Sequence, residues 1–242
     1  MVEKTVLDCG LTVLSERRGE FPSVALSFTL KEGSRHETRQ NNGIHHLIEH
    51  LLFKGSRRFD QRTIADISDR LGGHLNAYTS KEITQFYLTC VDDKRQEAFE
   101  LLADLVLAAQ FPQAEFAKEK NVIVQEIHES DDTPDSFAFE LFYEEVYPGD
   151  PLGFPIAGKE PVISAMTSEE VVRFYRQAYR PENLVLAATG AIDHRELVAM
   201  ATRVTRGCPA APPRHWQPAP LLPARRTIRR PKSDLQQVYL IA

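Results

Sequence analysis

The chain has 242 residues, of which 42% are hydrophobic, 26% charged and 9% aromatic. This usage is typical of globular proteins and excludes collagen-like, coiled-coil and intrinsically disordered chains. No apolar run reaches the roughly 18 residues that a membrane span needs, and the first residues show no signal-peptide pattern. We therefore expect a soluble, cytoplasmic protein that has no membrane partner.

Charge is divided unevenly along the chain, although the net charge is only −5. Residues 1–202 hold 21 Lys and Arg against 33 Asp and Glu, whereas residues 203–242 hold 8 basic residues and one acidic residue. No Lys or Arg occurs between Lys120 and Lys159, where acidic residues are frequent. This stretch is either a solvated acidic helix face or a field that attracts a basic substrate. The acidic body disfavours a nucleic-acid partner.

Apolar periodicity predicts the secondary structure of the first 200 residues or so. In chain order the expected elements are strands at 5–8, 11–15 and 24–30, helices at 43–54 and 63–71, strands at 74–79 and 84–91, a long helix broken at Phe111-Pro112, helices at 113–129, 136–146 and 167–178, a strand at 184–189 and a last helix capped by Asp193. Asn41 or Asn42 offers an N-cap for the first helix, and Thr167 with Glu170 forms a capping box.

The C-terminal part of the sequence differs in composition. Seven of the fifteen prolines lie between residues 209 and 231, with basic residues between them, which is typical of an extended linker. Residues 236–241 have a strand's composition but no following partner strand. We therefore divide the chain into a folded domain at 1–206, a Pro-rich basic linker at 207–232, and the first strand of a missing second domain at 233–242.

A five-residue motif, His46-Leu-Ile-Glu49-His50, lies inside the first expected helix. Residues at i and i+4 share one helix face, so His46 and His50 can present imidazole nitrogens to one zinc ion. Glu49 shares that face and is a candidate general base for a water molecule that the metal activates. A catalytic zinc site needs a third protein ligand from another element. Glu126 in the helix expected at 113–129 fits this requirement.

Glu119 lies seven residues before Glu126, on nearly the same face of the same expected helix, and could orient one of the ligands. The composition alone would produce the five-residue motif in roughly one of forty such chains. An alternative therefore stays open from the motif alone, in which the two histidines pack in the fold and Glu49 forms a surface ion pair.

Residues 43–55 closely resemble the signature of the pitrilysin and insulinase family of inverted zinc peptidases, which includes the mitochondrial processing peptidase. Further similar blocks follow in the family's order within about residues 3–205, namely LGGHLNAYTS at 71–80, 119–127, PLG at 151–153 and YRPEN at 179–183. The resemblance implies a zinc-dependent peptidase. It also implies a second, similarly folded module that closes over the peptide.

The resemblance also assigns roles to individual residues. It implies that the zinc ligands are His46, His50 and Glu126, that the general base is Glu49, and that the supporting carboxylate is Glu119. Family members bind the substrate as an extended strand, and the positions that hydrogen-bond its backbone match Asn76 and Ala77. Phe53 matches a residue near the pocket beyond the scissile bond, although ordinary helix packing explains it nearly as well.

His45 departs from the family pattern, which usually has a small residue there. Its position directly before His46 turns it off the metal face, so we expect a packing role for it. His74 and His128 are ambiguous, and we leave both outside the site.

We interpret the chain as an α+β, two-layer module with a mixed, mainly antiparallel sheet and helices packed on one side. The expected function is a Zn²⁺-dependent endopeptidase that hydrolyses short, unfolded or basic peptides bound as an extended strand. The alternative is a non-catalytic or latent half that needs a second homologous module, in the same chain or in another, for activity.

Overall fold

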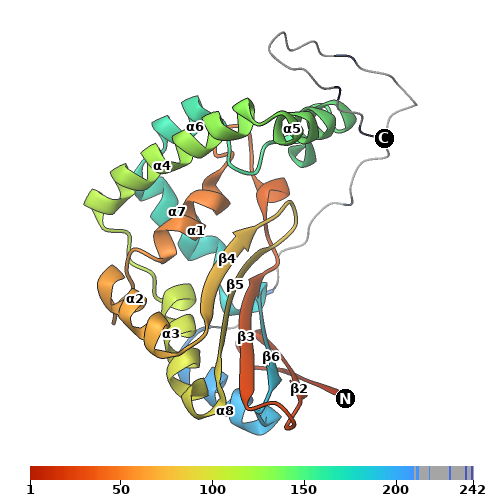
Figure 1. Ribbon diagram of the computed structural model, residues 1–242. Helices are drawn as coiled ribbons and strands as arrows, with labels where there is room; N and C mark the ends of the chain where they lie inside the picture. The colour runs from red at the N-terminus through yellow and green to blue at the C-terminus, as the bar shows by residue number, and fades with distance from the viewer. Residues whose placement is uncertain (210, 213–217, 219–228, 230–237, 239–240, 242) are drawn as a thin grey trace.

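The computed structural model describes residues 1–209 together with 211, 212, 218, 229, 238 and 241 (Figure 1). Its strands are β1 (Val2–Val6), β2 (Thr12–Arg17), β3 (Ser23–Leu30), β4 (His74–Thr79), β5 (Thr84–Val91) and β6 (Leu184–Gly190). Its helices are α1 (Ile44–Leu52), α2 (Gln61–Arg70), α3 (Arg95–Leu107), α4 (Gln113–Asp132), α5 (Pro134–Val146), α6 (Glu160–Ala165), α7 (Ser168–Ala178) and α8 (His194–Val204). Most of the expected linker and the expected strand at 236–241 lie outside the described residues.

The six strands form one sheet in the order β1-β2-β6-β3-β5-β4 (Figure 1). β2 and β6 pair in parallel, and every other neighbouring pair is antiparallel. β6, the last strand among the described residues, lies between β2 and β3, so a segment near residue 190 belongs to the same sheet as the N-terminal strands. The predicted α+β fold with a mixed, mainly antiparallel sheet is confirmed.

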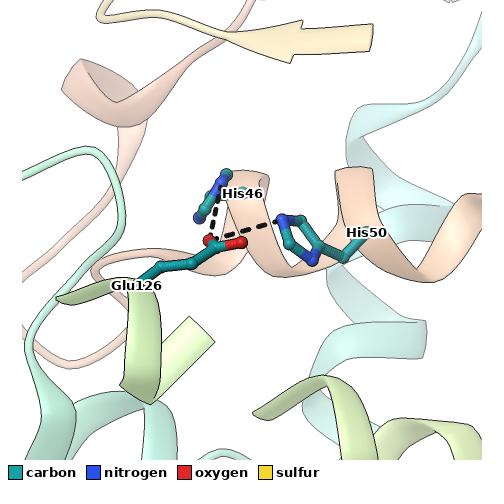
Figure 2. Close-up of side chains that lie close together, drawn as sticks. All are labelled: His46, His50 and Glu126. Atoms are coloured by element: carbon teal, nitrogen blue, oxygen red, sulfur yellow. Dashed lines mark ion pairs between the residues drawn. The ribbon is translucent and has the colours of Figure 1, made fainter. Parts of the chain in front are cut away.

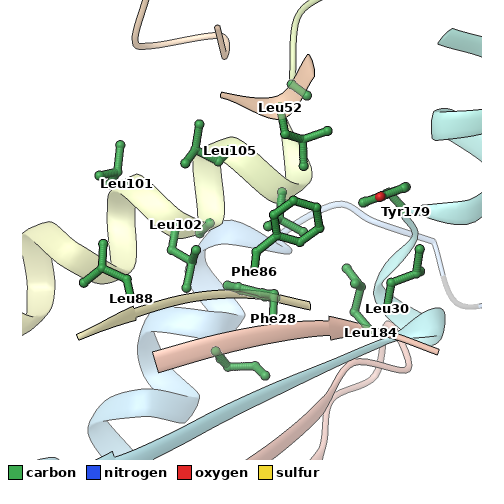
Figure 3. Packing of buried hydrophobic residues seen from close by; sticks show 14 of the residues in the cluster. Phe28, Leu30, Leu52, Phe86, Leu88, Leu101, Leu102, Leu105, Tyr179 and Leu184 are labelled. Carbon is green, nitrogen blue, oxygen red and sulfur yellow. The ribbon is translucent and has the colours of Figure 1, made fainter. Parts of the chain in front are cut away.

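The hydrophobic core lies between one face of this sheet and the helices. Every second residue of β3 is buried, and the intervening residues are half-buried. Phe28 of β3 and Phe86 of β5 are fully buried under α3, from which Leu102 points toward these strands, while Leu101 and Leu105, also buried, lie on the opposite side of that helix (Figure 3). Burying each such side chain contributes about 1.5–3 kcal/mol relative to exposure, so this packing fixes α3 and the sheet as one unit.

Some boundaries differ from the sequence prediction. β1 begins at Val2, three residues before the predicted strand, and most of it is exposed, so it lacks the apolar alternation that marks a half-buried strand. α2 begins at Gln61, because the Asp60 side chain accepts a hydrogen bond from the Thr63 amide. The six-residue helix α6 was not predicted, since it is too short for a helical period to show.

Two predicted helix starts are confirmed. The Thr167 side chain and Glu170 form the capping box of α7. The Asp193 side chain accepts a hydrogen bond from the Arg195 amide at the start of α8. Among the described residues, no helix combines the length and the apolar character required to cross a membrane.

Helix α1 lies where it can join the sheet to the outer helices. It contacts strand β4 at one edge of the sheet, and it also contacts α4 and α7 (Figure 1). A side chain on the polar face of α1 can therefore meet residues of both β4 and α4.

Candidate metal centre

Helix α1 buries one face and leaves the other for polar residues. Its buried residues recur at helical spacing and are Ile44, His45, Leu47, Ile48, Leu51 and Leu52. His46, Glu49 and His50 lie between these positions, at the edge of the packed face. Because the apolar stripe is held in the core, the helix cannot rotate to move its polar residues away from the site.

The two motif histidines and Glu126 converge on one point (Figure 2). Oε2 of Glu126 lies 3.8 Å from Nε2 of His46 and 3.6 Å from Nε2 of His50. One ligand atom from each of the three residues falls within 4.8 Å of the other two. Bond lengths of 2.0–2.2 Å in a tetrahedral zinc site imply ligand atoms about 3.4 Å apart, so this donor set fits a zinc ion after small side-chain adjustments.

Burial controls the protonation of His46. Desolvation, and to a smaller extent the neighbouring His50, lower the pKa of His46 to about 4. The ring is therefore neutral at pH 7, which is the form that binds a metal ion. Its Nδ1 atom is buried and has no hydrogen-bond partner. The orientation of this ring consequently depends on the helix backbone and on packing.

His50 is held by a carboxylate instead. Nδ1 of His50 lies 3.2 Å from Oε2 of Glu119, a buried residue of α4. The other carboxylate oxygen of Glu119 lies 2.9 Å from Nζ of Lys54. Such a carboxylate–histidine contact fixes the proton on Nδ1 and leaves Nε2 to bind a metal. Lys54 is not among the residues predicted from the sequence, although its i+4 spacing from His50 indicates a shared face.

Glu49 points toward the sheet edge. Its Oε2 atom accepts a 2.6 Å hydrogen bond from the Thr79 hydroxyl of β4. Burial raises the pKa of Glu49, while the hydroxyl and the backbone N–H of Thr79 act in the opposite direction. Thr79 is likewise not among the residues predicted from the sequence, although it lies within the LNAYTS block that resembles the family.

Strand β4 presents an open edge beside this carboxylate. In the described sheet β4 pairs only with β5. The hydrogen bond from the Ser80 amide to the Ile83 carbonyl sets the alternation of the ladder and turns the backbone groups of Ala77 and Thr79 toward the open edge. The Ala77 amide donates to Oδ1 of Asn76 at 2.9 Å. The carbonyls of Ala77 and Thr79 thus face an edge where a strand can be added, whereas the Ala77 amide would first have to exchange the Asn76 side chain for the added strand.

The remaining residues that the sequence analysis named lie away from the three ligand atoms. The ring of Phe53 is 6.5 Å from that of Phe86 and packs against the core. His45 is fully buried, and its ring meets Phe174 edge-on at 5.0 Å, which confirms that it faces away from the metal side. Nε2 of His128 lies 2.8 Å from Glu160 on the surface. His74 is exposed at the start of β4.

Comparison with known proteins identifies the family. Residues 12–160 match the family described as Insulinase (Peptidase family M16), and residues 165–242 match the family described as Peptidase M16 inactive domain. The chain belongs to peptidase family M16. The second match begins inside the folded unit described above, because β6, α7 and α8 follow residue 165 and β6 lies between β2 and β3.

Individual relatives support this membership and its fold. An uncharacterized zinc protease of Rickettsia felis is 37% identical over 232 residues, covering 96% of this chain and 56% of the relative. A probable mitochondrial-processing peptidase subunit beta of Schizosaccharomyces pombe is 33% identical, covering 83% of this chain and 44% of the relative. The crystal structure of a protease from Helicobacter pylori shares the fold, with a TM-score of 0.84, 23% identity, and coverage of 92% of this chain and 54% of that one. The chain thus spans about half the length of these M16 relatives.

Proposed function

We propose that this chain is the zinc-binding catalytic half of an M16 metalloendopeptidase. The observation that carries the proposal is the convergence of His46, His50 and Glu126 from two helices, with one ligand atom from each within 4.8 Å of the others. Membership of family M16 and the names of the relatives support peptide hydrolysis.

His46, His50 and Glu126 would hold the zinc ion, with Glu119 keeping His50 in the metal-binding tautomer. A zinc ion bound there would act as a Lewis acid that polarises a carbonyl oxygen and lowers the pKa of a water molecule. Glu49 would take the proton from the attacking water and then pass it to the leaving amine. The raised pKa of Glu49 suits both steps, because a general base whose pKa is nearer 7 also serves as the acid.

The substrate would bind as an extended strand along β4, with backbone hydrogen bonds near Asn76 and Ala77. We further propose that basic peptides are preferred, because the 38 residues between Lys120 and Lys159, which include Glu126, hold no Lys or Arg. A peptide pair of equal length and opposite charge tests this preference. We expect faster hydrolysis of the basic peptide, with an advantage that shrinks as salt is added; a salt-independent preference for the acidic peptide contradicts it.

A second candidate function follows from the length of the relatives. The chain covers 56% of the Rickettsia felis relative and 54% of the Helicobacter pylori structure. This half would then bind zinc but stay latent until a second homologous module closes over the peptide. Hydrolysis of an unstructured peptide before and after that module is added distinguishes the two proposals.

The substitution Glu49→Gln tests the proposed chemistry, assayed in the 242-residue chain with the second module added. We expect the variant to retain zinc and lose hydrolysis, since the amide cannot accept the proton. Glu82→Gln is a suitable control, because this carboxylate is exposed at the turn between β4 and β5. Turnover by Glu49→Gln at the wild-type rate would contradict the role of Glu49. Failure of the wild-type chain to bind zinc would contradict the proposal itself.

A further inference from the structure

The N-terminus of α1 has no cap from its own first residues. Its N-cap is Gly43, in the left-handed conformation with φ of 93°, and no side chain at this position caps the helix. The Asn41 or Asn42 cap that the sequence analysis predicted does not form. The first amides of an α-helix have no partner within the helix, so buried ones need an acceptor from elsewhere.

Glu37 supplies that acceptor from six residues upstream. Its Oε2 atom accepts hydrogen bonds from the Gly43 amide at 2.7 Å and from the Asn42 side chain at 2.9 Å. Its Oε1 atom accepts from the His45 amide at 3.0 Å. The carboxylate is only 3% exposed. Both of its oxygens are therefore used to fix the first turn of α1, at the positive end of the helix dipole.

Other contacts hold the same turn from outside. The Asn42 amide also donates to the Pro155 carbonyl at 2.9 Å. Gly43 packs so closely that an added Cβ atom would lie 2.8 Å from Cα of Gly158 and 2.6 Å from Cδ1 of Ile163. Glu37 thus acts within a packed junction, where losing its hydrogen bonds cannot be relieved by water.

The two proposed histidine ligands differ in how they are oriented. Nδ1 of His50 meets Glu119, whereas Nδ1 of His46 is buried without a hydrogen-bond partner. His46 directly follows His45, whose amide Glu37 binds. The direction in which Nε2 of His46 points is therefore set by the backbone that Glu37 holds. Metal sites need their ligands placed to within about 0.5 Å, so a small shift of this turn matters.

We propose that Glu37 is a positioning residue for the metal centre, which orders the first turn of α1 and so aims His46 at the point shared with His50 and Glu126. This inference rests on the proposed zinc function. Glu37 touches neither the metal ligands nor the substrate edge. Its effect should appear in zinc affinity itself, before any hydrolysis is measured.

Zinc titration of the full chain against a competing chromophoric chelator at pH 8 tests the proposal. In Glu37→Gln the side-chain amide must face at least one of the backbone amides that now donate to the carboxylate, so the first turn loses order. We expect zinc affinity to fall about 10–100-fold, the range for losing a supporting partner of a metal ligand. Circular dichroism without metal shows whether the fold persists.

Asp104→Asn is the matched control. Asp104 of α3 is likewise a buried carboxylate, and it accepts hydrogen bonds from the Ser56 hydroxyl at 2.5 Å and the Arg58 amide at 3.0 Å. We expect this variant to lose stability but keep wild-type zinc affinity. Such a result would separate a general loss of stability from a specific effect on the metal centre.

The outcomes separate the inference from the proposed function. Wild-type zinc affinity in a folded Glu37→Gln chain overturns the positioning role alone, whereas a wild-type chain that binds no zinc overturns both. If Glu37→Gln does not fold, the zinc affinity of Asn42→Ala is measured instead, because this substitution removes one of the three donors to Glu37. A severalfold loss of affinity relative to Asp104→Asn supports the role, and equal affinity contradicts it.

Discussion

Replacing Glu119 by Gln should weaken the metal site measurably. The Glu119 carboxylate is buried and lies between Nδ1 of His50 at 3.2 Å and Nζ of Lys54 at 2.9 Å. A neutral amide can accept from one of them but cannot balance the ammonium charge. Losing the outer partner of a metal-binding histidine typically costs 10–100-fold in affinity, or about 1.4–2.7 kcal/mol. The unpaired Lys54 should lower the unfolding free energy of the metal-free chain by about 1–3 kcal/mol.

Two measurements on the Glu119→Gln chain separate these effects. Chelator competition gives the zinc affinity, and urea unfolding without metal gives the stability. The control is Glu115→Gln, one turn earlier on α4, where the carboxylate pairs with the exposed Lys118. This control should change neither quantity by more than about 0.5 kcal/mol. Unchanged zinc affinity in Glu119→Gln would refute the reasoning that Glu119 orients His50.

Three further predictions concern stability. Gly43→Ala should lower the free energy of unfolding in urea by about 2 kcal/mol or more, because the new Cβ atom meets close contacts at a position that already has a left-handed backbone. Gly72 also has a positive φ but has open space around it, so Gly72→Ala should lower the free energy of unfolding by only about 1–2 kcal/mol. Equal losses in the two variants would contradict the packing argument. Burial raises the pKa of Glu37 from 4.5 to about 7, against the opposing effect of its hydrogen bonds and of Lys81. Between these two pH values the folded chain therefore binds a proton at Glu37 more tightly than the unfolded chain does. The unfolding free energy of wild type relative to Glu37→Gln should therefore fall by up to about 3 kcal/mol between pH 4.5 and 7, and a constant difference would contradict this. Asp193→Ala should destabilise the chain by about 0.5–2 kcal/mol through loss of the α8 cap, and no change in thermal unfolding would contradict that role.

Local patterns predicted the helix that carries the motif, because an apolar stripe at helical spacing fixes which face of α1 is buried. The shared face of His46 and His50 follows from the same geometry, and their ring centroids lie 4.7 Å apart. The capping residues of α7 and α8 could be predicted because a cap acts within a few residues of sequence.

Contacts between distant segments could not be predicted from such local patterns. The insertion of β6 between β2 and β3 depends on strand pairing across more than 150 residues, which no local period encodes. Thr79 meets Glu49 only because the sheet edge packs on α1, and Glu37 caps that helix from outside it. Residues that support the site from another element therefore needed the three-dimensional arrangement.

The most direct test is the zinc content of the purified 242-residue chain and of its Glu126→Ala variant, measured by elemental analysis after loading and gel filtration. We predict one zinc per wild-type chain, and far less in the variant, because Glu126 is the one proposed ligand from a helix other than α1. A wild-type chain that retains no zinc, or a variant that retains as much as wild type, would contradict the proposed metal centre.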